Sequence, residues 1–103
     1  MAWGINQLVQ VDKFLINLPD KVRAKVHSQV ILLGEKGPFL VYPYSKKVAP
    51  NLYELRIKGK DNLRIFYCFL KNQIWLVHGF RKKTQRLPAR EIQTAIDRIK
   101  SIV

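Results

Sequence analysis

The hydrophobic pattern of this chain changes period in the middle, and that change constrains the fold more than any other feature. Residues 52–58 alternate between apolar and charged side chains. Successive side chains of a strand point to opposite faces, so Tyr53, Leu55 and Ile57 would share one face. The pattern predicts a half-buried strand whose other face carries Glu54, Arg56 and Lys58.

Two more strands are expected after this one. Residues 59–62 read as a turn, and residues 63–70 form a second strand that is apolar on both faces except for Arg64. Residues 71–73 turn the chain again, into a third strand over residues 74–80. The middle of the chain is therefore predicted to be an antiparallel meander.

Helical spacing flanks the meander on both sides. A short helix is expected over residues 7–17, and an amphipathic helix begins at Asp20, with Gly34 as its cap and Gly37-Pro38 as a stop. A last helix follows Pro88. The order predicts an α+β fold, in which an N-terminal helical hairpin packs on a small antiparallel β-meander followed by a C-terminal helix. The length of the chain fits one domain over residues 1–103.

Cysteine content and hydropathy point to the cytoplasm. Cys68 is the one cysteine, so an intramolecular disulfide is impossible. The N-terminus lacks a basic leader, and no segment approaches the roughly 20 apolar residues that cross a bilayer. We therefore expect a cytoplasmic protein without a membrane partner.

The positive charge is concentrated in one segment. The chain has 19 Lys and Arg against 7 Asp and Glu, and residues 46–86 hold 11 of the basic side chains but 2 of the acidic ones. Such a cluster repels itself, and a polyanionic partner such as nucleic acid explains its presence. A basic surface that serves only solubility is the alternative.

Arg64 is the most informative of these basic residues. It interrupts a strongly apolar strand, where an unpaired guanidinium would be costly, so it needs an anionic partner. Glu54 could be that partner within the protein. Alternatively, Arg56 and Arg64 converge to hold an RNA phosphate, which suits the planar guanidinium fork.

The segment after the third strand supplies further candidates. His78 is either an acid or base in phosphodiester transfer or a hydrogen-bonded core residue. Residues 81–86 are either a solvated basic loop or part of an RNA site, and Phe80, Tyr42 and Tyr44 either stack on unpaired bases or belong to the core. The full set of RNA-binding candidates is Arg56, Lys58, Lys46, Lys47, Phe80, Arg81 and Arg86.

The sequence lacks the motifs of several other kinds of active or binding site. The sequence has no glycine-rich phosphate loop, no nucleophile elbow and no Cys/His set for zinc. Its two histidines and seven acids are scattered, which argues against a metal-dependent nuclease site. Any catalysis is therefore expected to need neither metal nor cofactor.

Several of these motifs together resemble a known family. They are Leu52-Tyr53-Glu54-Leu55-Arg56, Arg64-Ile65-Phe66-Tyr67 and the run from His78 to Gln85, followed by Pro88 and Glu91. In this order and spacing they resemble the phage-derived, HigB-like branch of the RelE/ParE toxins, from about Val11 to Ile99. Relatives usually begin with a strand, but only Trp3-Gly4-Ile5 precedes the first helix here. We therefore expect that strand to be shortened or absent, with a sheet edge left open if it is lost.

The resemblance implies a function as well as a fold. It implies a toxin that cleaves messenger RNA on the ribosome by attack of the ribose 2′-hydroxyl, and that binds an acidic, HigA-like helix-turn-helix antitoxin. Arg64 and Lys82 or Lys83 would act on the scissile phosphate, with Arg56 and His78 as further candidates. A ParE-like toxin that binds a topoisomerase and a non-catalytic RNA-binding domain remain the alternatives.

Overall fold

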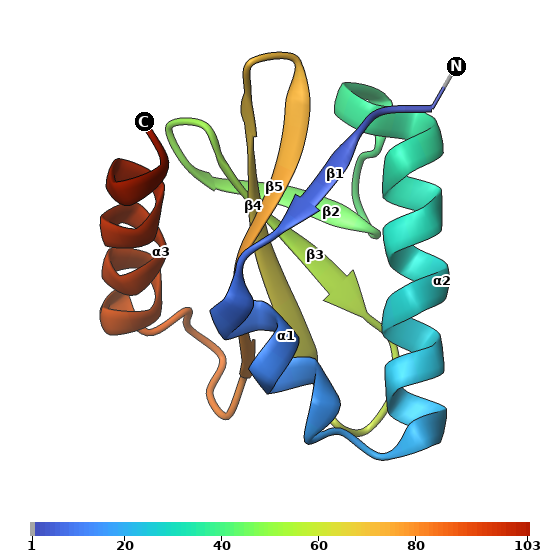
Figure 1. Cartoon of the computed structure of the whole chain (residues 1–103). Helices are drawn as coiled ribbons and strands as arrows, with labels where there is room; N and C mark the ends of the chain where they lie inside the picture. The colour runs from blue at the N-terminus through green and yellow to red at the C-terminus, as the bar shows by residue number, and fades with distance from the viewer. Residues whose placement is uncertain (1) are drawn as a thin grey trace.

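A five-stranded mixed sheet forms the centre of the protein, in a computed structural model that describes residues 2–103. The strand order is β1-β5-β4-β3-β2, and every neighbouring pair is antiparallel except β1 and β5. Figure 1 shows the sheet between the helices. The strands are β1 (Ile5–Gln7), β2 (Ser45–Ala49), β3 (Leu52–Ile57), β4 (Leu63–Leu70) and β5 (Gln73–Arg81).

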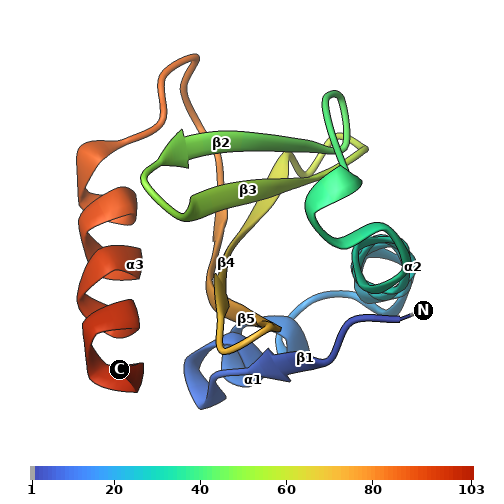
Figure 2. The ribbon, with the colours of Figure 1, turned by 90° about the horizontal axis from the view of Figure 1, so that it is seen from above.

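Helices cover both faces of the sheet. Helices α1 (Val9–Ile16) and α2 (Asp20–Lys36) lie between β1 and β2 in the chain, a short 3-10 turn η1 (Gly37–Phe39) follows α2, and α3 (Ala89–Ile102) follows β5. Figure 2 shows α2 and α3 on opposite sides of the sheet. The helical hairpin and the C-terminal helix predicted from the sequence are thus both present.

Each face of the sheet has its own hydrophobic core. Leu55, Ile65 and Leu76 belong to the core on the side of α1 and α2. Phe66 and Val77 belong to the core under α3. Residues 63–68 of β4 are buried on both faces, so this strand needs cover on both sides.

The N-terminal strand is present, which corrects the expectation that it could be absent. The three residues of β1 pair in parallel with β5, with Ile5 opposite Ile74. The backbone N–H of Trp3 also donates to the carbonyl of Gly34 at 2.7 Å. A Cβ on Gly34 would lie 3.2 Å from the Ile5 side chain, so this glycine lets β1 approach α2 closely. The sheet is therefore mixed, and β1 covers the edge of β5.

The other differences concern element boundaries and one additional strand. The first helix begins at Val9 because Gln7 belongs to β1, and α2 continues past Gly34 to Lys36. Gly37 ends α2 instead, with φ of +53°, a conformation that glycine adopts without strain. Strand β2 was not predicted, because Ser45-Lys46-Lys47-Val48-Ala49 lacks apolar alternation.

Cys68 lies on β4 in the core under α3 and is fully buried. Burial raises the pKa of its thiol to about 11. The thiol is therefore protonated at neutral pH and packs as a small apolar side chain.

None of the helices within residues 2–103 has both the length and the apolar character needed to cross a membrane.

Candidate nucleic-acid interface

Helix α3 covers only part of its sheet face. It packs through residues such as Ile92, Ala95 and Ile99 against Phe66 and its neighbours. Beyond the helix, the same face continues to the ends of β3 and β4. The alternation expected for these strands places Arg56 and Arg64 there, directly opposite one another in the β3–β4 register.

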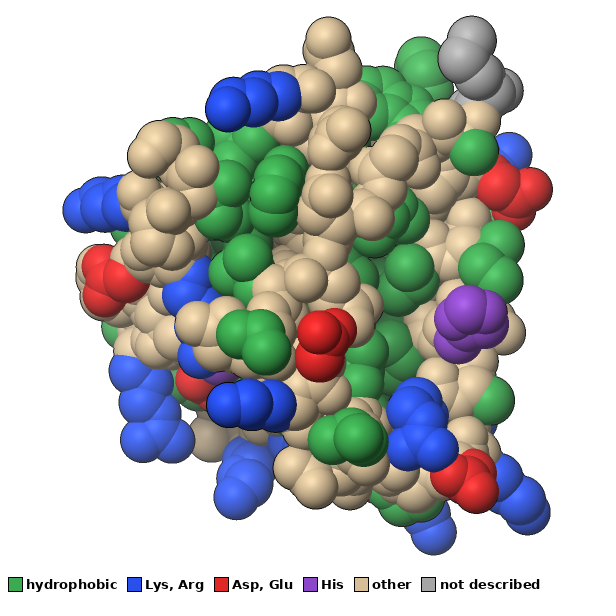
Figure 3. All heavy atoms as spheres, viewed as in Figure 1, with side chains coloured by type: hydrophobic (Ala, Val, Ile, Leu, Met, Phe, Trp, Pro, Cys, Tyr) green, Lys and Arg blue, Asp and Glu red, His purple; other side chains and the backbone are tan. Residues whose placement is uncertain are grey.

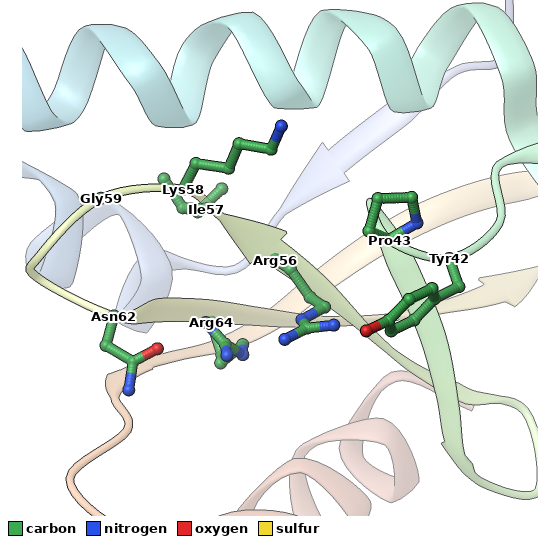
Figure 4. A pocket seen from close by; sticks show the side chains of 8 residues that line it. All are labelled: Tyr42, Pro43, Arg56, Ile57, Lys58, Gly59, Asn62 and Arg64. Carbon is green, nitrogen blue, oxygen red and sulfur yellow. The ribbon is translucent and has the colours of Figure 1, made fainter.

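Two adjoining pockets at this end of the sheet form what we call the basic groove. They share Arg56, Asn62 and Arg64, and Figure 4 shows the first pocket with these side chains. Lys82 and Lys83 line the second pocket together with both arginines. The structure therefore brings four of the sequence-predicted cations together. The residues lining the groove are Tyr42, Pro43, Arg56, Ile57, Lys58, Gly59, Asn62, Arg64, Lys82, Lys83, Thr84 and Gln85.

Arg64 is 5% exposed and has a protein partner. Its Nε lies 3.6 Å from Glu54 Oε1, and one terminal nitrogen donates to the Leu63 carbonyl at 2.9 Å. Burial lowers the pKa of Arg64, Glu54 opposes that shift, and the neighbouring Arg56 adds to it. An arginine nevertheless keeps its proton at neutral pH. Arg64 is thus a buried cation at the wall of the groove.

Glu54 forms ion pairs with both Arg56 and Arg64. It is 3% exposed, and its Oε1 lies 3.8 Å from Arg56 Nε as well as 3.6 Å from Arg64 Nε. These are ion pairs at distances longer than a hydrogen bond. The internal partner considered from the sequence is therefore real, but both guanidinium groups also line the groove. Each arginine therefore pairs with Glu54 and lines the groove at the same time.

Asn62 fixes the backbone at Lys82, a role that the sequence analysis did not predict. Its side-chain amide donates to the Lys82 carbonyl at 2.7 Å, and the Lys82 backbone N–H donates to the Asn62 carbonyl at 2.9 Å. Asn62 has φ of +53°, which asparagine tolerates better than most residues. An asparagine in the turn Gly59-Lys60-Asp61-Asn62 was the available signal.

The side chains of Lys58 and Arg56 point in different directions, although the alternating sequence pattern predicted both on one face of the strand. Strand β3 ends at Ile57, so strand alternation no longer governs Lys58. Figure 4 shows the Lys58 side chain directed toward α2, away from Arg64. Its Nζ lies 5.8 Å from the centre of the Tyr44 ring. Lys58 therefore lines only the outer part of the groove.

The remaining basic candidates lie outside the basic groove. Arg81 is opposite Leu63 in the register and pairs with Asp61 at 2.7 Å. Arg86, Lys46 and Lys47 are exposed. Figure 3 shows many of the Lys and Arg side chains along the lower edge of the molecule.

His78 has hydrogen-bond partners on both ring nitrogens, both from α3. Nε2 lies 3.1 Å from Glu91 Oε1, and Arg98 lies 3.0 Å from Nδ1. A neutral ring with its proton on Nε2 satisfies both contacts, since it donates to Glu91 and accepts from Arg98. Burial lowers the pKa of His78; the contact with Glu91 opposes this, and Arg98 adds to it. Of the two roles left open by the sequence, this geometry favours the hydrogen-bonded core residue.

Phe80 is likewise part of the core. It is 5% exposed, and its ring stacks on His78 with centroids 5.5 Å apart. Phe66 meets it edge to face at 5.0 Å. These contacts favour the core role for Phe80 over stacking on a base.

The groove can hold an anion by charge and by directed donors. Guanidinium groups offer several N–H donors in a plane, and the lysines add mobile ammonium groups. No group of three or more His, Cys, Asp or Glu side chains within residues 2–103 is arranged to hold a metal ion. What the groove offers a substrate is therefore a set of cations around one opening.

Comparison with known proteins agrees with this architecture. The family described as Phage derived protein Gp49-like (DUF891) matches residues 13–100. No curated protein matches the chain. A free-state structure of an E. coli toxin RelE mutant, with two arginines replaced by alanine, matches with a TM-score of 0.70 at 13% identity, covering 100% of both chains. The fold is thus that of RelE, and the chain belongs to the phage-derived Gp49-like family, the HigB-like toxin branch that its motifs resemble.

Proposed function

We propose that this protein is the toxin of a type II toxin-antitoxin system and cleaves messenger RNA on the ribosome. The observation that carries the proposal is the gathering of Arg56, Arg64, Lys82 and Lys83 around one groove. Family membership and the RelE fold support it. A groove that gathers these cations suits a phosphodiester that gains negative charge in the transition state.

The proposed reaction uses the substrate's own nucleophile. The ribose 2′-hydroxyl attacks the adjacent phosphorus and releases its proton to solvent, and the bond from phosphorus to the 5′-oxygen breaks. Arg56 and Arg64 stabilise the charge on the phosphoryl oxygens, and Lys82 or Lys83 donates a proton to the departing 5′-oxygen. The ribosome orients the RNA for in-line attack, which supplies much of the rate. The products are a cyclic phosphate and a free 5′-hydroxyl.

The proposed protein partner is an acidic, HigA-like helix-turn-helix antitoxin. The formal charge of +12 favours association with an acidic protein. Carboxylates of that partner placed over the basic groove would exclude RNA. An adjacent reading frame that encodes a small helix-turn-helix protein would support this partnership.

A translation assay tests the proposal. Purified protein is added to ribosomes that translate a defined message, and the RNA is resolved on a gel. We expect discrete fragments from the wild type and about 100-fold slower cleavage by Lys82→Ala and Arg64→Ala, the usual loss when one transition-state donor is removed. Lys100→Ala, on the exposed side of α3, is the matched control and should cleave normally.

The same assay separates the alternative functions. A ParE-like toxin would leave the message intact and inhibit a topoisomerase in a supercoiling assay. A non-catalytic RNA-binding domain would bind RNA with a strong dependence on salt and yield no fragments. Intact message with folded wild-type protein would contradict the nuclease proposal.

A further inference from the structure

An exposed aromatic ring lies at one end of the basic groove. Tyr42 is 67% exposed, and it lines the part of the groove that also contains Arg56 and Arg64. Figure 4 shows the ring beside the Arg56 side chain. Such exposure means that the ring adds little to the core and that most of its surface is open to a ligand.

Backbone hydrogen bonds hold the turn that carries this ring beside Arg56. The Arg56 N–H donates to the Tyr44 carbonyl at 2.9 Å, which ties the turn to β3. The Tyr44 N–H donates to the Val41 carbonyl at 3.0 Å and closes the turn around Tyr42. The guanidinium carbon of Arg56 lies 5.1 Å from the centre of the Tyr42 ring, within the range of a cation–π contact. This contact favours the observed orientation of Tyr42 in the absence of a ligand.

We propose that Tyr42 stacks on one base of a single-stranded RNA whose phosphate lies between Arg56 and Arg64. The inference rests on the proposed RNA-directed function and adds a base-binding subsite to it. A nucleotide carries a flat π-face and an anion only a few ångströms apart, which matches an aromatic ring beside two guanidinium groups. An apolar protein segment over Tyr42 would instead take water from Arg56, whose single carboxylate partner Glu54 is shared with Arg64, at considerable cost.

Binding of two short RNAs to the free protein tests this subsite. One probe is an oligoadenylate, and the other is an abasic oligoribonucleotide of equal length, which keeps the phosphates and lacks the bases. We expect the wild type to prefer the oligoadenylate. Tyr42→Ser should bind the oligoadenylate about 5- to 150-fold more weakly, the usual loss for one stacked base, and bind the abasic probe as the wild type does.

Two further variants sharpen the comparison. Tyr42→Phe keeps the ring and should retain the preference for bases. Phe39→Ser removes an aromatic that is 83% exposed in η1, outside the basic groove, and should leave both affinities unchanged. Lys82→Ala should weaken both probes to a similar extent, because it acts on phosphate.

Equal binding of both probes by the wild type would overturn the proposal. So would a Tyr42→Ser variant that keeps the preference for bases, a result that would assign the ring to a protein partner. Cleavage of ribosome-bound messages is scored separately. A preference for bases that depends on Tyr42, without any cleavage, would contradict the nuclease proposal alone, whereas cleavage without that preference would contradict the stacking subsite alone.

Discussion

At the scale of single residues, Glu54 is the side chain on which both guanidinium groups of the basic groove depend. Its carboxylate is almost fully buried and lies within 4 Å of Nε of both Arg56 and Arg64. Without it, two like charges would face each other across neighbouring strands, and one of them is buried. A buried charge that loses its counter-ion is strongly destabilising.

We predict that Glu54→Gln lowers the free energy of unfolding by about 3 kcal/mol, the lower end for a broken buried pair, because Arg56 stays partly in water. Urea unfolding measures this. The double variant Glu54→Leu with Arg64→Met replaces the pair by apolar groups and should recover most of the lost stability. A Glu54→Gln protein as stable as the wild type would show that the carboxylate does not stabilise the arginines.

The pH dependence of stability should report on His78. Burial lowers its pKa below the ordinary 6.5, so the unfolded chain takes up the proton at a higher pH than the folded protein does. The stabilisation is complete above pH 6.5 and is lost as pH falls from there toward the folded-state pKa. Urea unfolding of the wild type at a series of pH values should show this loss. His78→Gln should remove this part of the pH dependence, whereas His27→Gln, on the exposed surface of α2, should keep it.

How much of the site was predictable differs from residue to residue. Alternation along β3 and the odd position of Arg64 in an apolar strand were enough to predict that the two arginines converge. The environment of His78 was not predictable, because Glu91 and Arg98 come from a helix whose position depends on tertiary packing. The ion pair of Arg81 with Asp61 also depends on the register between β4 and β5, which local sequence does not encode.

At the scale of elements, local periodicity predicted the helices and the three long strands, missed β2, and left β1 as a strand that was shortened or absent. Strands β3, β4 and β5 and helices α2 and α3 carry enough residues for their period to be recognised. Strand β1 has three residues and pairs in parallel with a strand about 70 positions away, so it leaves no local pattern. Strand β2 pairs at the edge of the sheet, and its two consecutive lysines interrupt the apolar alternation by which a strand is recognised.

The packing of α1 on β5 depends on Gly79. A Cβ at this position would lie 2.5 Å from Cδ2 of the Phe14 ring and 3.1 Å from the Ile65 side chain. We predict that Gly79→Ala destabilises the protein by about 1 to 3 kcal/mol, the usual cost of overpacking. Thermal or urea unfolding gives the value, and Phe14→Leu combined with Gly79→Ala should regain part of it. Additive losses in the double variant would argue against a clash with Phe14.

At the scale of the whole molecule, the proposed binding of RNA depends on the net positive charge and on the basic groove. Four cations line the second pocket of the groove, so if each neutralises one phosphate the slope of log affinity for single-stranded RNA against log salt is about −3. We predict that Lys82→Ala makes this slope shallower by about 0.7 and that Lys100→Ala leaves it unchanged. Fluorescence anisotropy over a salt series measures both slopes. An unchanged slope for Lys82→Ala would mean that this lysine does not meet phosphate.

The reciprocal hydrogen bonds between Asn62 and Lys82 have a consequence for recognition. They join the turn before β4 to the start of the segment after β5, which fixes the backbone where Lys82 enters the groove. The backbone entropy of this region is lost when the chain folds, and little remains to be lost when an anion arrives. This part of the groove is preorganised, because the folded backbone and not the bound anion determines its width.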